Sequence, residues 1–324
     1  MNKTVKNKSM TAYGYYRPAS LELRADIKRA IRNDEFYGFE GIPSFKEFKK
    51  MKWQALWLDL NVKGILGENM LTQIIFMENA WKNNPVCLVP ESADLKETLK
   101  GIRIEGVLDK IKTPATVFTV SIPKGMLFNG EKINGCLVSK TSHTSSNKML
   151  RAMGEEYNVS GVPENQPVWD YIADRFTLTY QIGTEKMRYV ANMCSSKLTN
   201  ILSSKDYAEY ESKLGRNSMG DGLTREEITT QYELLRFVLG MLVYTSSGEG
   251  SITKIDSIYM DAPGETKKIK VAMSRINHFK VRNGVSPHYR QLSAERYYQG
   301  DWHDWERGSR FIPVNMELSL VDKA

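Results

Sequence analysis

The stretch TREEITTQYELLRFVLGMLVYTSS, residues 224–247, decides the fold that the sequence predicts. Thr224 is followed three residues later by Glu227, and this Thr-x-x-Glu pattern is a capping box that begins a helix. The apolar residues after it lie nearly all round the helix, which is typical of a buried helix rather than a surface one. The Ser-Ser-Gly run at 246–248 indicates its end. The sequence therefore predicts one long helix at the centre of the core.

Segments rich in β-branched and aromatic residues precede and follow this helix, and they predict strands. The clearest is TPATVFTVSIP, residues 113–123. The Asn129-Gly130 pair that follows is typical of a hairpin turn, with residues 136–138 as the return strand. Further strands are expected at VCLVP (86–90), RFTLTYQIG (175–183) and FIPVNMELSL (311–320). The order of elements predicts an α+β fold with a helical N-terminal part, a mixed or antiparallel sheet, a central apolar helix and a C-terminal strand.

Four parts of the chain differ in composition. Helices are expected at the start, at residues 67–85 and in the stretch that runs up to Leu214. Residues 140–168 are polar and predict a loop between two better-ordered parts. The division is therefore a basic, aromatic helical segment (1–63), a helix with a β-hairpin (64–139), the polar loop (140–168) and an α+β C-terminal part (169–324).

Composition excludes several classes of protein. The 324 residues carry a net charge of +7, and residues 1–63 hold thirteen Lys/Arg against seven Asp/Glu. Such an excess favours binding to polyanions, although it also serves solubility alone. The three cysteines have no partner at metal-ligand spacing, and neither a phosphate-binding nor a dinucleotide-binding glycine motif is present. We therefore expect no metal, no cofactor and no membrane segment, and a cytoplasmic protein.

One segment near the C-terminus gathers most of the chain's reactive side chains. VSPHYRQLSAERYYQGDWHDWERGSR, residues 285–310, lies within a region that holds three of the four histidines. On a strand, His288 and Arg290 share a face, and a histidine beside an arginine suits acid–base chemistry at a phosphodiester. The same segment supplies cations and rings for phosphate contact and base stacking. These candidate RNA- or ribosome-binding residues are His288, Arg290, Arg296, Tyr297, Tyr298, Trp302, Trp305 and Arg310.

Two other interpretations of this segment remain open from the residues alone. Its acidic residues are able to neutralise the arginines, and aromatic rings near a final strand are ordinary core and rim material. The candidates for catalysis are His288, Arg290 and His303.

Several stretches together resemble a group of phage and plasmid proteins. Pro287-His288-Tyr289-Arg290 resembles the group's Pro-His-x-Arg element, and residues 80–83 (AWKN) resemble the end of one of its helices. The strand that begins at Thr113-Pro114 and the apolar helix LLRFVLGMLVY occur in the same order, so the resemblance covers roughly residues 65–318. The family is the one that contains the large type V-A anti-CRISPR protein.

The resemblance implies a regulator from a mobile genetic element that recognises a nascent polypeptide and causes loss of its messenger RNA. The candidate target is the nascent chain of a type V-A CRISPR effector nuclease. The family's motif continues with a glycine and a second histidine, whereas this chain has Gln291-Leu292-Ser293-Ala294. A pair of RNA-cleaving histidines at that spacing is therefore missing. This favours cleavage by a host nuclease over the hypothesis that the protein is itself an enzyme.

The expected partners are accordingly a nascent polypeptide and RNA or the ribosome. Peptide binding calls for apolar pockets or an open strand edge, and the candidates are Trp53, Trp57, Trp81 and Phe118. Two alternatives remain. One is an intrinsic metal-independent endoribonuclease that uses His288 and His303 with Arg290 and Arg310. The other is a plasmid or phage protein that only binds nucleic acid.

Overall fold

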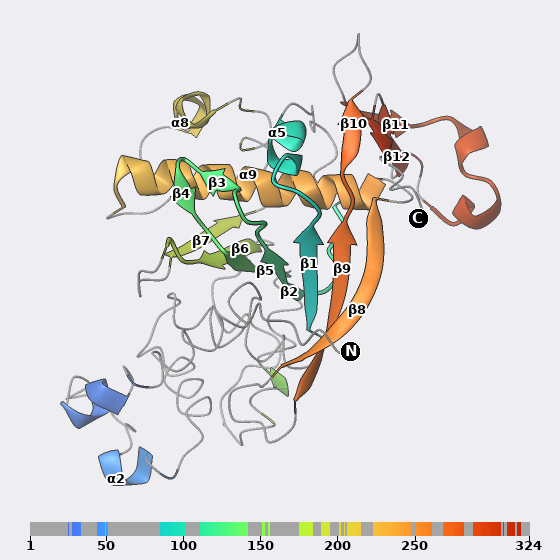
Figure 1. Cartoon of the computed structure of the whole chain (residues 1–324). Helices are drawn as coiled ribbons and strands as arrows, with labels where there is room; N and C mark the ends of the chain where they lie inside the picture. Colours follow the sequence, from blue (N-terminus) through green and yellow to red (C-terminus); the bar gives the residue numbers. More distant parts are fainter. Residues whose placement is uncertain are drawn as a thin grey trace, which may run out of the picture.

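A computed structural model gives the fold of the chain, and the helices and strands below belong to the part that it describes (Figure 1). The described residues are 25, 28–33, 44–48, 50, 85–100, 111–141, 151–152, 155, 175–183, 189–194, 201, 204, 206–214, 223–247, 251–260, 268–281, 288–305, 307, 310–314 and 316–318. The predicted helix at 67–85 and residues Trp53, Trp57 and Trp81 lie outside them.

The long helix α9, Arg225–Ser247, begins and ends where the sequence predicts. The Thr224 N–H donates to the Glu227 carboxylate (2.7 Å), and the Glu227 N–H donates to the Thr224 hydroxyl (3.2 Å), so both halves of the capping box are formed. Residues 234, 235, 238, 239, 241, 242 and 243 on it are completely buried. The prediction of a central buried helix is confirmed.

A seven-stranded mixed sheet packs against α9 (Figure 1). Its strand order is β7-β6-β5-β2-β1-β9-β8. The central strand β1 is parallel to both β2 and β9, and every other neighbouring pair is antiparallel. The bounds are β1 Val86–Pro90, β2 Val117–Ser121, β5 Gly135–Thr141, β6 Arg175–Tyr180, β7 Tyr189–Cys194, β8 Ile252–Met260 and β9 Ile269–Ile276. The fold is α+β, as predicted.

The predicted hairpin turn is a two-residue connection between β3, Leu127–Phe128, and β4, Glu131–Lys132. Asn129 and Gly130 both have positive φ, 48° and 81°, which is the backbone that a type I′ turn requires. The predicted return strand is β5, which pairs antiparallel with β2.

Short helices cover the same face of the sheet as α9 (Figure 1). The helix α5, Leu95–Lys100, connects β1 to β2 and packs on α9, as does α8, Tyr207–Leu214. The N-terminal part contains α2, Phe45–Phe48, capped by the Ser44 side chain and Glu47. The buried apolar side chains of α9, α5 and the facing sides of the strands form one continuous core.

The structure corrects two local expectations and adds one detail. Residues 189–194 form the edge strand β7 rather than a helix, because they pair antiparallel with β6. The alternating segment at β6 is buried on both faces, with Thr177 and Thr179 only 1% and 4% exposed. The expected final strand is divided into β12, Arg310–Val314, and β13, Met316–Leu318, which pair with β11, His288–Leu292, and β10, Phe279–Val281, respectively.

Candidate nucleic-acid interface

His288, Tyr289 and Arg290 of the Pro-His-x-Arg element lie on the strand β11, His288–Leu292. The antiparallel pair β11–β12 sets His288 opposite Val314, Arg290 opposite Ile312 and Leu292 opposite Arg310. His288 and Arg290 therefore occupy alternate positions of one strand, and the His288 side chain lies outside the described residues. The Arg290 side chain is exposed. The predicted residues His288, Arg290 and Arg310 are thus brought onto one small sheet.

The segment between these strands is held to them by a tyrosine. Two short 3-10 turns follow β11, Glu295–Tyr297 and Gly300–Trp302. Tyr298 between them is 9% exposed, and its hydroxyl donates to the carbonyl of Leu292 at the end of β11. Tyr298 is therefore an anchor of the segment, and its buried ring is not a surface for base stacking, contrary to our expectation.

Arg296 and Tyr297 are in contact on the surface of this segment, and Arg290 is exposed on the preceding strand β11. The Arg296 guanidinium lies 4.9 Å from the centre of the Tyr297 ring and donates to the Tyr297 hydroxyl (3.0 Å). This hydrogen bond and the charge of Arg296 lower the pKa of Tyr297, and the charge of Arg290 adds to the effect. We call these three residues the arginine–tyrosine group.

A pair of tryptophans forms a second feature of the segment. The rings of Trp302 and Trp305 meet edge to face, with centroids 4.8 Å apart and planes at 77°. The ammonium of Lys112 lies 3.5 Å from the centre of the Trp305 ring, which is a cation–π contact. The Lys112 backbone exchanges hydrogen bonds with the Ser246 hydroxyl in the last turn of α9. Lys112 is a residue that sequence reasoning missed, because it precedes Trp305 by almost two hundred positions.

The exposed histidine of this segment, His303, is held by its neighbours. Its Nδ1 lies 2.7 Å from the Gly300 carbonyl, and its Nε2 lies 3.0 Å from the Asp304 carboxylate. His278, in contrast, is half-buried beside Thr98 and Phe279. Among the described residues, the ring of His303 contacts Gly300 and Asp304, and whether it forms a pair with a second histidine stays a prediction.

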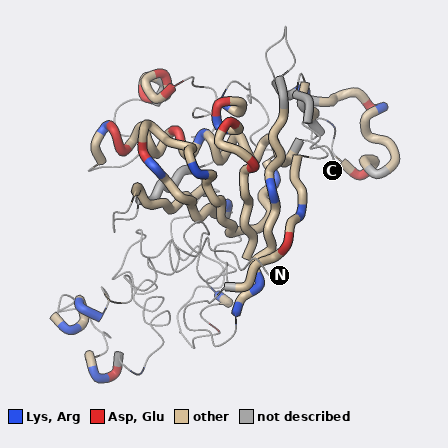
Figure 2. The backbone as a smooth tube through the Cα atoms, in the orientation of Figure 1, with Lys and Arg blue, Asp and Glu red and all other residues tan. Residues whose placement is uncertain are grey.

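The charges of this region are balanced rather than strongly basic. Residues 288–310 contain four arginines, at 290, 296, 307 and 310, and four acidic residues, at 295, 301, 304 and 306. Arg307 and Glu295 form an exposed ion pair (2.9 Å). Over the described chain, basic and acidic segments are interspersed (Figure 2). The arrangement therefore suits contact through stacked rings with a few cations, which is how single-stranded nucleic acid is bound, more than attraction by net charge.

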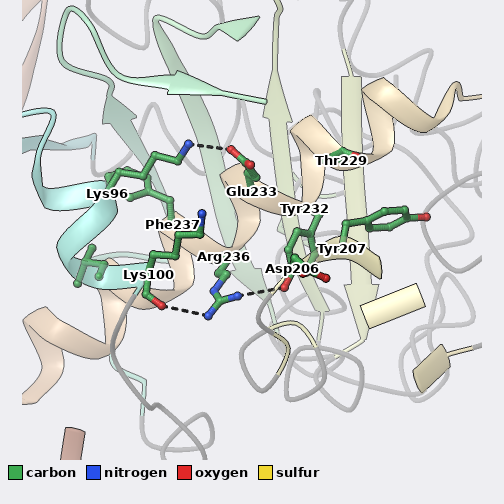
Figure 3. Close-up of a pocket in the computed structure, with 10 residues that line it drawn as sticks. Lys96, Lys100, Asp206, Tyr207, Thr229, Tyr232, Glu233, Arg236 and Phe237 are labelled. Atoms are coloured by element: carbon green, nitrogen blue, oxygen red, sulfur yellow. Dashed lines mark hydrogen bonds and ion pairs between the residues drawn. The ribbon is translucent and has the colours of Figure 1, made fainter. Parts of the chain in front are cut away.

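A pocket lies between α5, α8 and α9, on the helical face of the molecule (Figure 3). It holds about 540 Å³ of space, part of it open to solvent. Six of its ten lining residues are polar or charged and the other four are aromatic or apolar, and Lys100 and Asp206 among them are exposed. The lining residues are Lys96, Leu99, Lys100, Asp206, Tyr207, Thr229, Tyr232, Glu233, Arg236 and Phe237.

Two polar groups hold the elements around this pocket together. Lys96 on α5 pairs with Glu233 on α9 (2.7 Å), and its ammonium also donates to the Leu127 carbonyl of β3 (Figure 3). Arg236 donates to the carbonyls of Ser204 and Lys100 (3.2 Å to the latter). These contacts join residues 31 to 137 positions apart in the chain, so they could not be predicted from local sequence patterns.

One predicted peptide-binding residue is contradicted. The Phe118 side chain is 0% exposed in the core between the sheet and α9, because β2 lies between β1 and β5 in the middle of the sheet. A central strand offers neither a free ring nor a free edge to a peptide. Trp53, Trp57 and Trp81 lie outside the described residues, so their role stays a prediction.

Within the described ranges, no group of three or more His, Cys, Asp or Glu side chains is placed to hold a metal ion. None of the helices described is long and apolar enough to span a bilayer.

Comparison with known proteins gives a distant structural match. No family model and no curated protein matches the chain. The crystal structure of AcrVA2 is similar to it over 94% of both chains, with 10% sequence identity and a TM-score of 0.36. A TM-score of this size does not establish a common fold.

Proposed function

We propose that this protein is an anti-CRISPR-like regulator from a mobile genetic element, which recognises a nascent polypeptide and causes loss of the messenger RNA that encodes it. The arginine–tyrosine group is the observation that carries the proposal. Arg290 belongs to the Pro-His-x-Arg element of the family that the sequence resembles and is exposed on β11, while Arg296 contacts the Tyr297 ring. This group would contact RNA or the ribosome through charge and stacking.

The pocket between α5, α8 and α9 is the place that we propose for the target polypeptide. Leu99, Phe237 and Tyr232 offer apolar walls that suit an apolar side chain. Exposed Lys100 and Asp206 are placed to meet the backbone or a charged neighbour of that side chain. This pocket takes the place of Phe118, which we expected to bind the peptide but which lies on the central strand β2.

Loss of the message is assigned to a host nuclease. The family's second histidine is replaced in this chain, and the exposed His303 is engaged by Gly300 and Asp304. The protein would therefore select the message, and another enzyme would cut it.

Capture of the tagged protein from cells, followed by sequencing of the co-purified messages, tests the proposal. We expect one or a few messages to be enriched, and we expect puromycin, which releases nascent chains, to abolish the enrichment. Enrichment that survives puromycin would mean direct binding to RNA and would remove the nascent-chain step. Enrichment of no message would remove the proposal entirely.

Matched variants separate the two surfaces. The double variant Arg290→Ala, Arg296→Ala should preserve the fold, because both side chains are exposed. It should abolish loss of the message, because it removes both cations of the arginine–tyrosine group. Lys100→Glu should abolish enrichment of the message, and Lys124→Glu, which changes an exposed lysine between β2 and β3, is its control. If the arginine variant silences the target as well as the parent protein does, the arginine–tyrosine group has no part in function.

A further inference from the structure

The strand β8 is an edge of the sheet that carries exposed apolar side chains. It lies at one end of the strand order, and within the described part of the chain β9 is its only hydrogen-bonded neighbour (Figure 1). Ile252, Ile255 and Tyr259 on it are 40%, 38% and 64% exposed. Only one other large hydrophobic residue in the described chain, Leu127, is comparably exposed. Such an edge is a template for pairing with another strand.

The sequence of β8 is complementary to itself when it is read antiparallel. Its residues 252–258 are ITKIDSI, with Ile255 in the middle. Two such strands related by a two-fold axis at Ile255 would set Lys254 of each copy opposite Asp256 of the other. Both side chains are exposed, and basic and acidic segments adjoin on this outer strand in Figure 2. Opposite charges at directly opposed positions stabilise an antiparallel pair.

The register within the sheet limits how far this pairing extends. Ile255 lies opposite Met273 and Ile258 opposite Val271, so residues 256 and 257 both fall opposite Ala272. This irregularity is a β-bulge, in which the two residues on the bulged strand project to the same side. Asp256 then shares a face with Lys254, as the crossed charge pairs require. Beyond Asp256 the alternation is displaced, and the regular pairing is confined to residues 254–256.

We propose that β8 pairs antiparallel with β8 of a second copy of this chain and joins the two sheets into one. Two Lys254–Asp256 pairs would flank the contact on one face, and the two Ile255 side chains would meet on the other. The interface is isologous, so it closes as a dimer and does not propagate into a fibre. Because it uses few residues, the dimer should dissociate on dilution.

Charge exchange between copies tests the proposal. The parent protein should show a concentration-dependent dimer in sedimentation equilibrium over roughly two decades of concentration. Lys254→Asp makes both edge charges acidic, and Asp256→Lys makes both basic. Each variant alone should dimerise at least about tenfold more weakly, because two attractive pairs become two repulsive ones. An equimolar mixture of the two variants should recover the dimer, as should the double variant K254D/D256K.

Recovery in the mixture is the decisive result, because only direct contact between position 254 of one copy and position 256 of the other produces it. A parent protein that is monomeric at every concentration would overturn the proposal. If every variant dimerises as the parent does, the dimer interface lies on another surface, and this result also overturns the proposal. Circular dichroism of each variant checks that the exposed substitutions leave the fold intact. If the β8 edge binds an extended peptide instead, the parent protein and both charge variants should all be monomers.

Discussion

Glu233 is half-buried on α9, and its carboxylate accepts hydrogen bonds from two distant elements. The Lys96 ammonium donates from α5 (2.7 Å), and the Asn129 backbone N–H donates from the hairpin turn (2.8 Å). The side chains of Lys96 and Glu233 are only 15% and 28% exposed, so removal of one partner leaves a poorly solvated charge. This contact fixes the turn against both helices.

Glu233→Gln should therefore destabilise the protein. The amide keeps an acceptor for Asn129 but leaves Lys96 without its counter-charge, and we expect the free energy of unfolding to fall by about 1–2 kcal/mol in denaturant titrations. Glu211→Gln is the control, because Glu211 and Arg225 are 3.6 Å apart and well exposed. That change should stay within about 0.5 kcal/mol. Equal losses in the two variants would contradict a special role for Glu233.

The thiols of Cys87 and Cys136 should be unreactive in the native protein. Burial raises the pKa of both, so the nucleophilic thiolate is scarce as well as inaccessible. Mass spectrometry after treatment with a thiol reagent should show both sites modified only when denaturant is present. Because the raised pKa values keep the native thiols protonated, the free energy of unfolding should fall as the pH rises above the ordinary thiol pKa. Rapid native labelling of either cysteine would contradict the buried position of β1 or β5.

At the scale of elements, two glycines should respond oppositely to alanine. Gly130 has φ +81° in the β3–β4 turn, so Gly130→Ala strains the backbone and should cost about 1 kcal/mol. Gly240 lies inside α9, where an added Cβ would meet the Leu99 Cβ at an ordinary 3.7 Å. Gly240→Ala should raise the stability by up to about 1 kcal/mol through helix propensity. Thermal unfolding measures both, and a loss in Gly240→Ala would show that α5 and α9 are packed more tightly than the 3.7 Å contact indicates.

Elements fixed by local rules could be predicted from the sequence, and elements fixed by distant partners could not. The capping box of α9 and the Asn129-Gly130 turn each involve residues a few positions apart, and both form as predicted. The strand β7 was missed because its pairing with β6 decides its structure. The position of β1 between β2 and β9 also depends on residues far apart in the chain, as does the contact of Lys112 with Trp305.

At the scale of the whole molecule, the net charge of +7 and the balanced charge of residues 288–310 suggest different modes of RNA binding. If the net charge dominated, binding would be strongly dependent on salt. The described surface instead offers Trp302, Trp305 and Tyr297 with few cations, which favours stacking. How steeply affinity falls with salt therefore reports which surface holds the RNA.

Purified protein with labelled single-stranded RNA should bind it and leave it intact without added metal. If Arg290, Arg296 and Lys112 supply the phosphate contacts, the slope of log K against log salt should be roughly −2. Trp305→Leu should lower the affinity by about 1–3 kcal/mol with little change in that slope, because it removes a ring and no charge. Arg290→Gln should make the slope shallower, whereas Lys124→Gln, which removes an exposed charge elsewhere, should not. If the parent protein instead cleaves the RNA and the His303→Ala variant does not, the protein is an intrinsic ribonuclease.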